Sequence, residues 1–379
     1  MASDGDSAGA GGRRGPLFAV IAAALGIVVG FAGLEAALGW LRNGVETSHR
    51  LDRGLIRYDA GLGWVAAPGW RGRHRHHDFD VGYTTNPFGF RGTFDGAMDP
   101  GTGRRIGILG DSFTFGLGVD DGETLADELG RRAPPGTAVL NLAVPGYSTD
   151  QELLLAERLM TTLYRPTELV IVVYLANDVI DNELAWPIQA AQAKPYFRLA
   201  ERGLTLHNVP VPQTPKPAAE RARTLGAILH DGLPPPGIVA RTIGGLEVVR
   251  RLGIVWPAPP TLFPQSEARF RPSLDLFAAL VARLRTVAAR HRMRLTLALL
   301  PGRSFFARSD SASAQYQDHV RREIVRRAGA MGIEVVDLGA GLRARSGAPA
   351  AAGLYFPNDG HLTPAGHRAV AGLLAERLF

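Results

Sequence analysis

The segment that decides the fold runs from Ile106 to Val119 and reads Ile-Gly-Ile-Leu-Gly-Asp-Ser-Phe-Thr-Phe-Gly-Leu-Gly-Val. The apolar run at its start predicts a short β-strand, and the glycine-rich stretch that follows predicts a turn. Ser112 would then lie at the carboxyl end of a strand, where open α/β sheets bind their ligands. A hydroxyl held there on a rigid element indicates ester chemistry with serine as the nucleophile.

Two other uses of this turn are excluded by its residues. A phosphate-binding loop needs Gly-x-x-x-x-Gly-Lys-Ser/Thr, and no lysine lies near Ser112. The Gly-x-Ser-x-Gly elbow is also missing, because Asp111 precedes the serine and Phe113 and Thr114 follow it. The remaining alternative is a serine that caps a helix in an ordinary turn. In either case we expect Asp111 to bond the local backbone and Phe113 to lie in the core.

Composition restricts the class of protein. The chain has 379 residues, of which 46% are hydrophobic and 21% charged, so it can bury a large core in one or two domains. It has no cysteine, which excludes disulfides, thiolate zinc sites and a thiol nucleophile. The net charge is +6, but the basic residues are interspersed with acidic ones, so we expect no nucleic-acid partner.

An apolar stretch near the N-terminus predicts a membrane segment. Residues 17–34 carry no charge, and a second apolar run follows Glu35 up to Leu41. We expect a disordered tail at residues 1–16 and a retained anchor at 17–41, because the stretch exceeds a signal-peptide core; a cleaved signal is the alternative.

The orientation of this segment follows from its flanks. Arg13 and Arg14 precede it, but more arginines follow it, so the arginine count does not favour a cytoplasmic N-terminus. Large domains cross largely regardless of charge, and a short tail that ends in paired arginines is typical of an exported anchor. We expect a single-pass protein of the cell membrane with its catalytic domain outside the cytoplasm.

The rest of the chain divides into a lead-in and an α/β domain. In residues 43–104, Gly, Asp, Trp and Pro recur at short intervals, which is typical of short strands and turns. In residues 105–379, predicted strands alternate with predicted helices, as in a parallel sheet. The predicted strands are 106–109, 138–144, 169–175, 295–300 and 333–338. An insertion at 182–271 holds 13 of the 26 prolines and is predicted to form a cap, with a hairpin at 195–207 and a helix at 238–252.

Two helix starts are predicted from caps. Thr149-x-x-Glu152 matches a capping box, and Thr363 followed by Pro364 matches an N-cap with proline in the first turn.

A base for Ser112 lies near the C-terminus. His361 belongs to Asn358-Asp-Gly-His-Leu-Thr-Pro-Ala-Gly-His367, in a loop after the last predicted strand. This loop would bring His361 to the sheet edge that carries Ser112, and Asp359 could turn back onto the ring. His367 is the other candidate, but it falls in the first turn of the terminal helix.

Two further residues at the same edge are candidate oxyanion donors. Gly146 follows the second strand with an unshielded amide, and Asn177 follows the third strand with a side-chain amide. Together with the amide of Ser112 they would form a pocket of three donors. The alternatives are a turn glycine and a capping asparagine.

Four segments resemble the sequence blocks of the SGNH hydrolases, also called GDSL esterases. They are Gly110-Asp-Ser-Phe, Asn141-Leu-Ala-Val-Pro-Gly-Tyr-Ser, Leu175-Ala-Asn-Asp and Asp359-Gly-His, in the order of the family. The resemblance covers about residues 104–379 except most of the insertion. It implies a three-layer α/β/α, flavodoxin-like fold, with Ser112 as nucleophile, His361 as base and Ser112, Gly146 and Asn177 as oxyanion donors.

The chain departs from this family pattern at two positions. Many members carry the acid three residues before the histidine, where this chain has Asn358, so the acid role moves to Asp359. The glycine of the third block is Ala176. The anchor, the lead-in segment 86–92 and the insertion resemble membrane-anchored bacterial members, some of which are linked to modification of surface polysaccharides.

These observations predict a membrane-anchored serine esterase that acts on acetyl or short acyl esters, with acylated surface polysaccharide as a candidate substrate. The alternatives are an O-acyltransferase that passes the acyl group to a sugar hydroxyl, and a non-catalytic glycan-binding relative. No metal or organic cofactor is expected. The segment Arg73-His-Arg-His-His-Asp-Phe-Asp80 offers possible ligands, but adjacent rings in a basic loop are usually solvated.

Overall fold

A computed structural model of the chain describes residues 15–47, 49–92, 103–160, 165–223, 228–229, 246, 248, 267–307 and 311–379. The chain separates into two compact units, one of residues 1–47 and 234–257 and the other of residues 48–233 and 258–379. All predicted site residues belong to the second unit.

The main described element of the first unit is helix α1, Gly15–Thr47. Its stretch Phe18–Leu41 is an apolar run of 24 residues, none of it buried in the protein. At about 1.5 Å per residue this run is about 36 Å long, enough to cross a hydrocarbon core of about 30 Å. The helix already begins at Gly15, within the stretch expected to be disordered, whose residues 1–14 lie outside the described part. By length and composition, α1 fits a membrane anchor and also a signal sequence.

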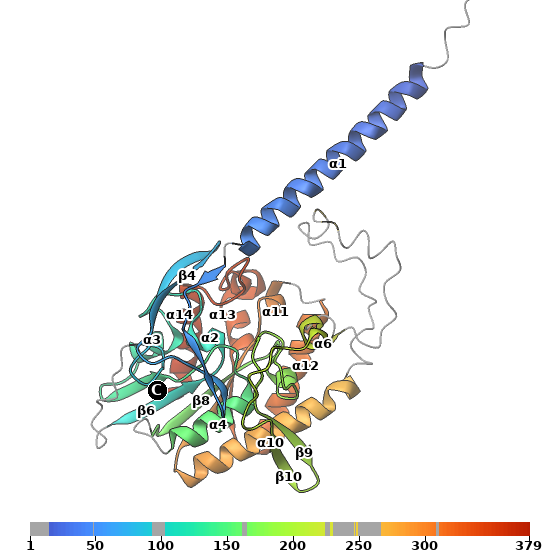
Figure 1. Ribbon diagram of the computed structural model, residues 1–379. Helices are drawn as coiled ribbons and strands as arrows, with labels where there is room; N and C mark the ends of the chain where they lie inside the picture. Colours follow the sequence, from blue (N-terminus) through green and yellow to red (C-terminus); the bar gives the residue numbers. More distant parts are fainter. Residues whose placement is uncertain are drawn as a thin grey trace, which may run out of the picture. The chain divides into compact units, whose positions relative to one another are not determined.

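The second unit is built around a parallel sheet with the strand order β12-β11-β8-β6-β7. Its strands β6 and β8 are labelled in Figure 1. The strands are β6 (Arg104–Leu109), β7 (Thr137–Asn141), β8 (Glu168–Tyr174), β11 (Arg294–Leu300) and β12 (Glu334–Asp337). All five overlap the predicted strands, and all neighbours run parallel. If these five strands are numbered 1 to 5 along the chain, their order in the sheet from the β7 edge is 2-1-3-4-5. This is the flavodoxin-like order.

The second strand is shorter than predicted, because β7 ends at Asn141 although its apolar run continues to Val144. The amides of Leu142 and Val144 still donate to the carbonyls of Ile108 and Gly110, at 2.9 and 3.1 Å. The apolar run therefore continues beside β6, but its last residues leave the regular ladder as the chain approaches the next turn.

Helices cover both faces of the sheet, as the three-layer prediction requires (Figure 1). Every residue of β8 is buried, which is expected of a parallel strand enclosed on both sides. One set of its side chains, including Ile171, packs with α4, α10 and α12, and the other set, including Val172, packs with α3, α13 and α14. The helices are α3 (Leu125–Gly130), α4 (Thr149–Leu159), α10 (Glu267–Arg290), α12 (Ala312–Ala330), α13 (Leu338–Ala352) and α14 (Pro364–Leu378).

One predicted helix cap is confirmed and the other is wrong. Thr363 caps α14, since its hydroxyl accepts a hydrogen bond from the amide of Gly366 at 3.1 Å. In α4 the cap position is taken by Ser148, whose backbone is extended, and Thr149 is already helical. Glu152 then falls one position too far along the helix for a capping box, and its side chain is buried instead.

The lead-in contains five strands in its described part: β1 (Arg50–Leu51), β2 (Ile56–Asp59), β3 (Gly63–Ala66), β4 (Arg71–His76) and β5 (Phe79–Thr84). They form two small antiparallel sheets, β1-β4-β5 and β2-β3. Their buried side chains, including Val81 and Tyr83, cluster with Phe115 and Ala143, which follow β6 and β7. The lead-in therefore packs beside the strand ends that carry the predicted site.

The described part of the insertion confirms the predicted hairpin, formed by β9 (Tyr196–Ala200) and β10 (Gly203–His207). A short helix, α6, follows at Ala218–Ala222, and α10 begins at Glu267, before the predicted end of the insertion at residue 271. The predicted helix at 238–252 lies almost wholly outside the described residues. A role for the insertion as a cap stays a prediction.

Candidate active site

Ser112 lies at the carboxyl end of β6, as the sequence predicts. It opens the short helix α2 (Ser112–Phe115), and Asp111 caps that helix by accepting a hydrogen bond from the amide of Phe113 at 2.9 Å. Burial raises the pKa of Asp111 to about 6, and the contact with Phe113 fixes its carboxylate on the local backbone, as expected. A Cβ at Gly110 would lie 2.2 Å from the hydroxyl of Thr114, so only glycine fits ahead of this turn.

The structure brings His361 to Ser112. Its Nε2 lies 2.8 Å from the Ser112 Oγ, and its Nδ1 lies 2.6 Å from Asp359 Oδ1. Because a carboxylate only accepts, the Nδ1 must carry the proton, which leaves the Nε2 lone pair for the serine hydroxyl. The ring of Phe113 packs on the imidazole with 4.5 Å between the centroids. The three side chains thus form a continuous line of hydrogen bonds.

The two candidates for the acid have different partners. Asp359 accepts from both the Nδ1 and the backbone amide of His361, the latter at 3.1 Å. Asn358 instead donates its side-chain amide to Asp78 of the lead-in, at 2.7 Å. Burial alone would raise the pKa of Asp359, but the hydrogen bond and charge of His361 outweigh it and lower the pKa, so this carboxyl is ionised at neutral pH.

Gly146 follows β7 in a turn that needs glycine, with a φ of 81°. Trp64 of the lead-in donates its indole Nε1 to the carbonyl of Pro145 at 2.9 Å. Because the peptide is planar, the Gly146 amide of the same peptide points away from Trp64. Within the described residues, the backbone amides of Gly146 and Ser112 donate no hydrogen bond to the protein.

Asn177 occupies the N-cap position of helix α5 (Asp178–Asp181) at the end of β8, but its side chain makes no capping hydrogen bond. Its side-chain amide donates to Asp181 at 2.7 Å, and Asp181 also accepts from the amide of Ile188 at 2.9 Å. An asparagine amide has two N–H groups, and Asp181 is its one acceptor among the described residues, so the second N–H can donate to a ligand. Sequence reasoning missed Asp181 and Trp64, which contact the candidate donors without belonging to their motifs.

A family comparison decides the class of the protein. The model of the GDSL-like lipase/acylhydrolase family matches residues 108–369. The chain belongs to this family. It is therefore a hydrolase of the SGNH superfamily that acts on ester bonds, and the predicted superfamily and fold class are confirmed.

The solved structures to which the chain is similar include several GDSL proteins. A putative SGNH hydrolase from Slackia heliotrinireducens is 15% identical, with 73% of this chain and 100% of that chain covered and a TM-score of 0.37. A member of the lipolytic G-D-S-L family from Veillonella parvula is 12% identical, with 73% and 98% covered and a TM-score of 0.39. An acetylxylan esterase from Geobacillus stearothermophilus, solved as a catalytic mutant, is 14% identical, with 74% and 95% covered and a TM-score of 0.38. No curated protein sequence matches the chain.

Among the described residues, His361 is the histidine of this GDSL hydrolase that is hydrogen-bonded to Ser112. His367 is fully buried in the first turn of α14, and burial lowers its pKa to about 3. His74 bonds the hydroxyl of Tyr83 at 2.6 Å and the ring of His49 at 2.7 Å, and burial lowers its pKa to about 4. In the part of the chain that the structure describes, no three histidine or acidic side chains are grouped as a metal site.

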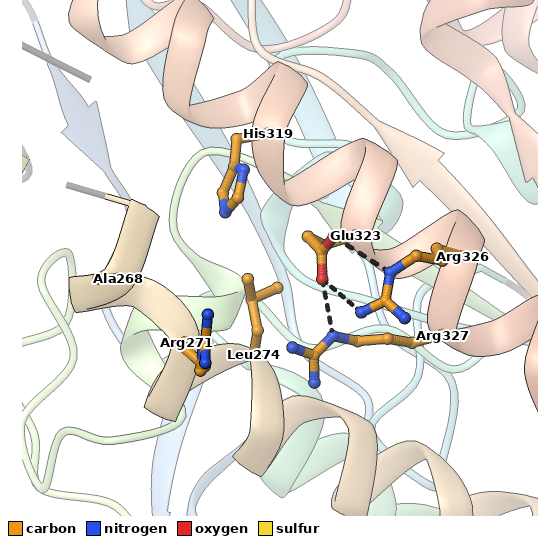
Figure 2. Close-up of a pocket in the computed structure, with 7 residues that line it drawn as sticks. All are labelled: Ala268, Arg271, Leu274, His319, Glu323, Arg326 and Arg327. Carbon is orange, nitrogen blue, oxygen red and sulfur yellow. Dashed lines mark hydrogen bonds and ion pairs between the residues drawn. The ribbon is translucent and has the colours of Figure 1, made fainter. Parts of the chain in front are cut away.

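A cavity of about 550 Å³ lies between α10 and α12 (Figure 2). Figure 2 shows Glu323 bonded to Arg326 and Arg327, with Arg271 across the cavity. None of the predicted site residues lines this cavity. Its lining carries three arginines against one glutamate and no hydroxyl side chain, so we assign it no part in the ester chemistry.

Proposed function

We propose that this GDSL hydrolase is a serine esterase that removes acetyl or other short acyl groups, with acylated polysaccharide as the candidate substrate. The observation that carries the proposal is the line of hydrogen bonds from Ser112 through His361 to Asp359, at 2.8 and 2.6 Å. Only 7% of Ser112 is exposed, so the substrate must bring its acyl carbon to a largely buried hydroxyl.

In the proposed reaction, Ser112 Oγ attacks the acyl carbon while His361 Nε2 takes the hydroxyl proton. The carbonyl oxygen becomes an oxyanion, which accepts from the amides of Ser112 and Gly146 and from the side chain of Asn177. His361 then protonates the leaving alcohol, and an acyl-enzyme forms on Ser112. Asp359 stabilises the imidazolium, and a water activated by His361 releases the acid.

The test is Ser112→Ala with a short-chain aryl ester as substrate. Removal of the nucleophile of a serine triad lowers kcat by on the order of 10⁴-fold or more, so we expect turnover to be lost while the thermal unfolding temperature is kept. Persistent turnover in this variant would refute Ser112 as the nucleophile. A folded wild-type protein without turnover would favour a glycan-binding relative instead.

Hydrolase and O-acyltransferase use the same acyl-enzyme and differ in the acceptor. The acyl group goes to water in the first case and to a sugar hydroxyl in the second. We expect hydrolysis of an acetyl donor to be unaffected by an added glycan acceptor. Acetylated glycan, formed at the expense of free acetate, would transfer the assignment to the acyltransferase.

We further propose that α1 anchors the enzyme in the cell membrane, with the second unit outside the cytoplasm. The support is an exposed apolar run of 24 residues in α1 and the paired Arg13 and Arg14 before it. Mass spectrometry of the membrane fraction should find the uncleaved N-terminus, and protease added to intact cells should digest the second unit. A soluble chain that lacks residues 17–41 would show a cleaved signal.

A further inference from the structure

The tip of the β4–β5 hairpin contacts the loop that carries the proposed acid and base. The carboxylate of Asp78 accepts from the backbone amides of Asn358 and Asp359, both at 2.9 Å. It also accepts from the side-chain amide of Asn358 at 2.7 Å. Only 5% of the Asp78 side chain is exposed, because these partners cover its carboxylate, whereas Asn358 itself lies at the surface.

Aromatic packing holds the same two segments together. The ring of Phe79, next to Asp78, lies 5.1 Å from the ring of Phe356 at the start of the loop, and 5.2 Å from His76. A Cβ at Gly118 would lie 2.8 and 3.0 Å from Phe356 and Phe79, so glycine at this position permits the contact. The hairpin tip therefore packs on the loop through rings as well as through hydrogen bonds.

Asp359 joins this contact to the reacting groups. Its backbone amide is held by Asp78, and its carboxylate is held by His361. The loop supplies few bonds of its own, among them Phe356 N to His361 O at 2.8 Å and Gly360 N to Phe356 O at 3.1 Å. Neither of these fixes the backbone of Asp359.

Asp78 is ionised at neutral pH. Burial would raise its pKa, but the hydrogen bonds from Asn358 and Asp359 outweigh this effect and lower the pKa.

We propose that Asp78 is a positioning residue for the ester reaction: it fixes the backbone of Asp359 so that the Asp359 carboxylate meets His361. The hairpin is then a part of the active site, although the match to the family begins only at residue 108. This role also accounts for Asn358, whose side chain serves the anchor rather than the histidine. The inference rests on the proposed function, since it presumes that Asp359 orients the base.

The first experiment compares Asp78→Ala with Asp80→Ala in the full chain, purified in detergent micelles. Asp80 lies in the same hairpin, but its side chain is 55% exposed and pairs with Arg73, so it is a matched control. Displacement of a catalytic group by about 1 Å can cost about 100-fold, so we expect Asp78→Ala to lower kcat by about 10- to 100-fold with KM little changed. Asp80→Ala should stay within about twofold of wild type. Equal activities of the two variants would overturn the inference.

A double-mutant cycle separates positioning from general stability. If Asp78 acts through Asp359, Asp78→Ala should cause little further loss in an Asp359→Ala background. The same fold loss in both backgrounds would show that Asp78 acts elsewhere and would overturn the proposal. If Asp78→Ala does not fold, Asp78→Asn replaces it, because its amide oxygen can still accept from both backbone amides while the bond from the Asn358 side chain is lost, and a partial loss of kcat is then expected.

A spectroscopic readout checks the geometry directly. The short bond between His361 Nδ1 and Asp359 should give a far-downfield imidazole proton in the NMR spectrum. We expect this signal in wild type, Ser112→Ala and Asp80→Ala, and its loss or broadening in Asp78→Ala. An unchanged signal in Asp78→Ala would contradict positioning. Activity in Ser112→Ala would instead contradict the proposed function, so the two failures are distinguishable.

Discussion

Asp359 and Asn358 are adjacent residues with different neighbours, and the difference predicts their effects on activity. Asp359 contacts His361 Nδ1 at 2.6 Å, whereas Asn358 contacts Asp78. Loss of the acid of a serine triad lowers kcat by on the order of 10⁴-fold, so Asp359→Ala should lower kcat by about 10³- to 10⁴-fold. Asn358→Ala removes one of three bonds to Asp78 and should cost about tenfold or less. Steady-state kinetics on a short-chain aryl ester measures both.

The reverse order would move the acid role to another residue. Asn358→Asp serves as a control, because it places a carboxyl where many relatives carry their acid. It also sets a second carboxylate against Asp78, so we expect it to lower the activity rather than raise it.

The residues that could be predicted from the sequence are those at strand ends. Ser112, Gly146 and Asn177 each follow an apolar run, and parallel strands bring such ends to one edge. The proposed positioning residue Asp78 does not follow an apolar run, so the sequence did not mark it in this way. Asp78 lies 280 residues from Asn358 along the chain, and its segment suggests metal ligands or solvated charge at least as readily as a loop anchor.

At the scale of elements, a buried ion pair joins the insertion to α4. The ammonium of Lys194 bonds Asp150, and both side chains are fully buried. Burial raises the pKa of Asp150 even though Lys194 lowers it, so the carboxylate depends on its partner. Loss of one partner of a buried pair costs about 3–5 kcal/mol, so Lys194→Met should lower the free energy of unfolding by about that amount.

Chemical denaturation of the full chain measures this effect. Lys194→Met combined with Asp150→Asn should recover part of the loss, because the second change removes the unpaired charge. An additive loss in the double variant would show that the two residues do not stabilise each other.

The strands were predicted better than the starts of helices. A buried strand is marked by several consecutive apolar residues, whereas a helix start depends on the backbone conformation of a single residue. In α4 the pattern Thr149-x-x-Glu152 fits a cap as well as the true start at Ser148 does. Five neighbouring residues, 148–152, are buried at this point. Their polarity makes them resemble an exposed helix start, and only tertiary packing against the lead-in and insertion reveals their burial.

At the scale of the whole molecule, the second unit is larger than the matched family domain because it includes the lead-in. Tyr147 donates its hydroxyl to the carbonyl of Trp64 at 2.6 Å, and Gln151 donates to the carbonyl of Leu62 at 2.7 Å. These bonds join the lead-in to α4 and to the turn that carries Gly146. The three layers could be predicted because strands and helices alternate along the chain. Contacts between the lead-in and α4 could not, because residues so far apart in the sequence share no repeating pattern.

Buried histidines make the stability of this unit depend on pH. His367 has a pKa of about 3 in the folded protein, lowered by burial first and then by the charges of Arg91 and His361, against about 6.5 when unfolded. Between these values the unfolded chain binds a proton that the folded chain does not. The free energy of unfolding therefore falls as the pH drops below about 6.5, by about 1.4 kcal/mol per unit for this group.

His367→Leu isolates this contribution. His74, with a folded pKa of about 4, adds to the same slope, and the raised pKa values of the buried Glu152 and Asp178 oppose it, so only the difference between two proteins is diagnostic. We expect the slope of unfolding free energy between about pH 6 and 4 to be about 1.4 kcal/mol per unit smaller in His367→Leu than in wild type. His291→Leu, at an exposed histidine, should leave the slope unchanged. Equal slopes in wild type and His367→Leu would show that His367 is not kept neutral in the folded protein.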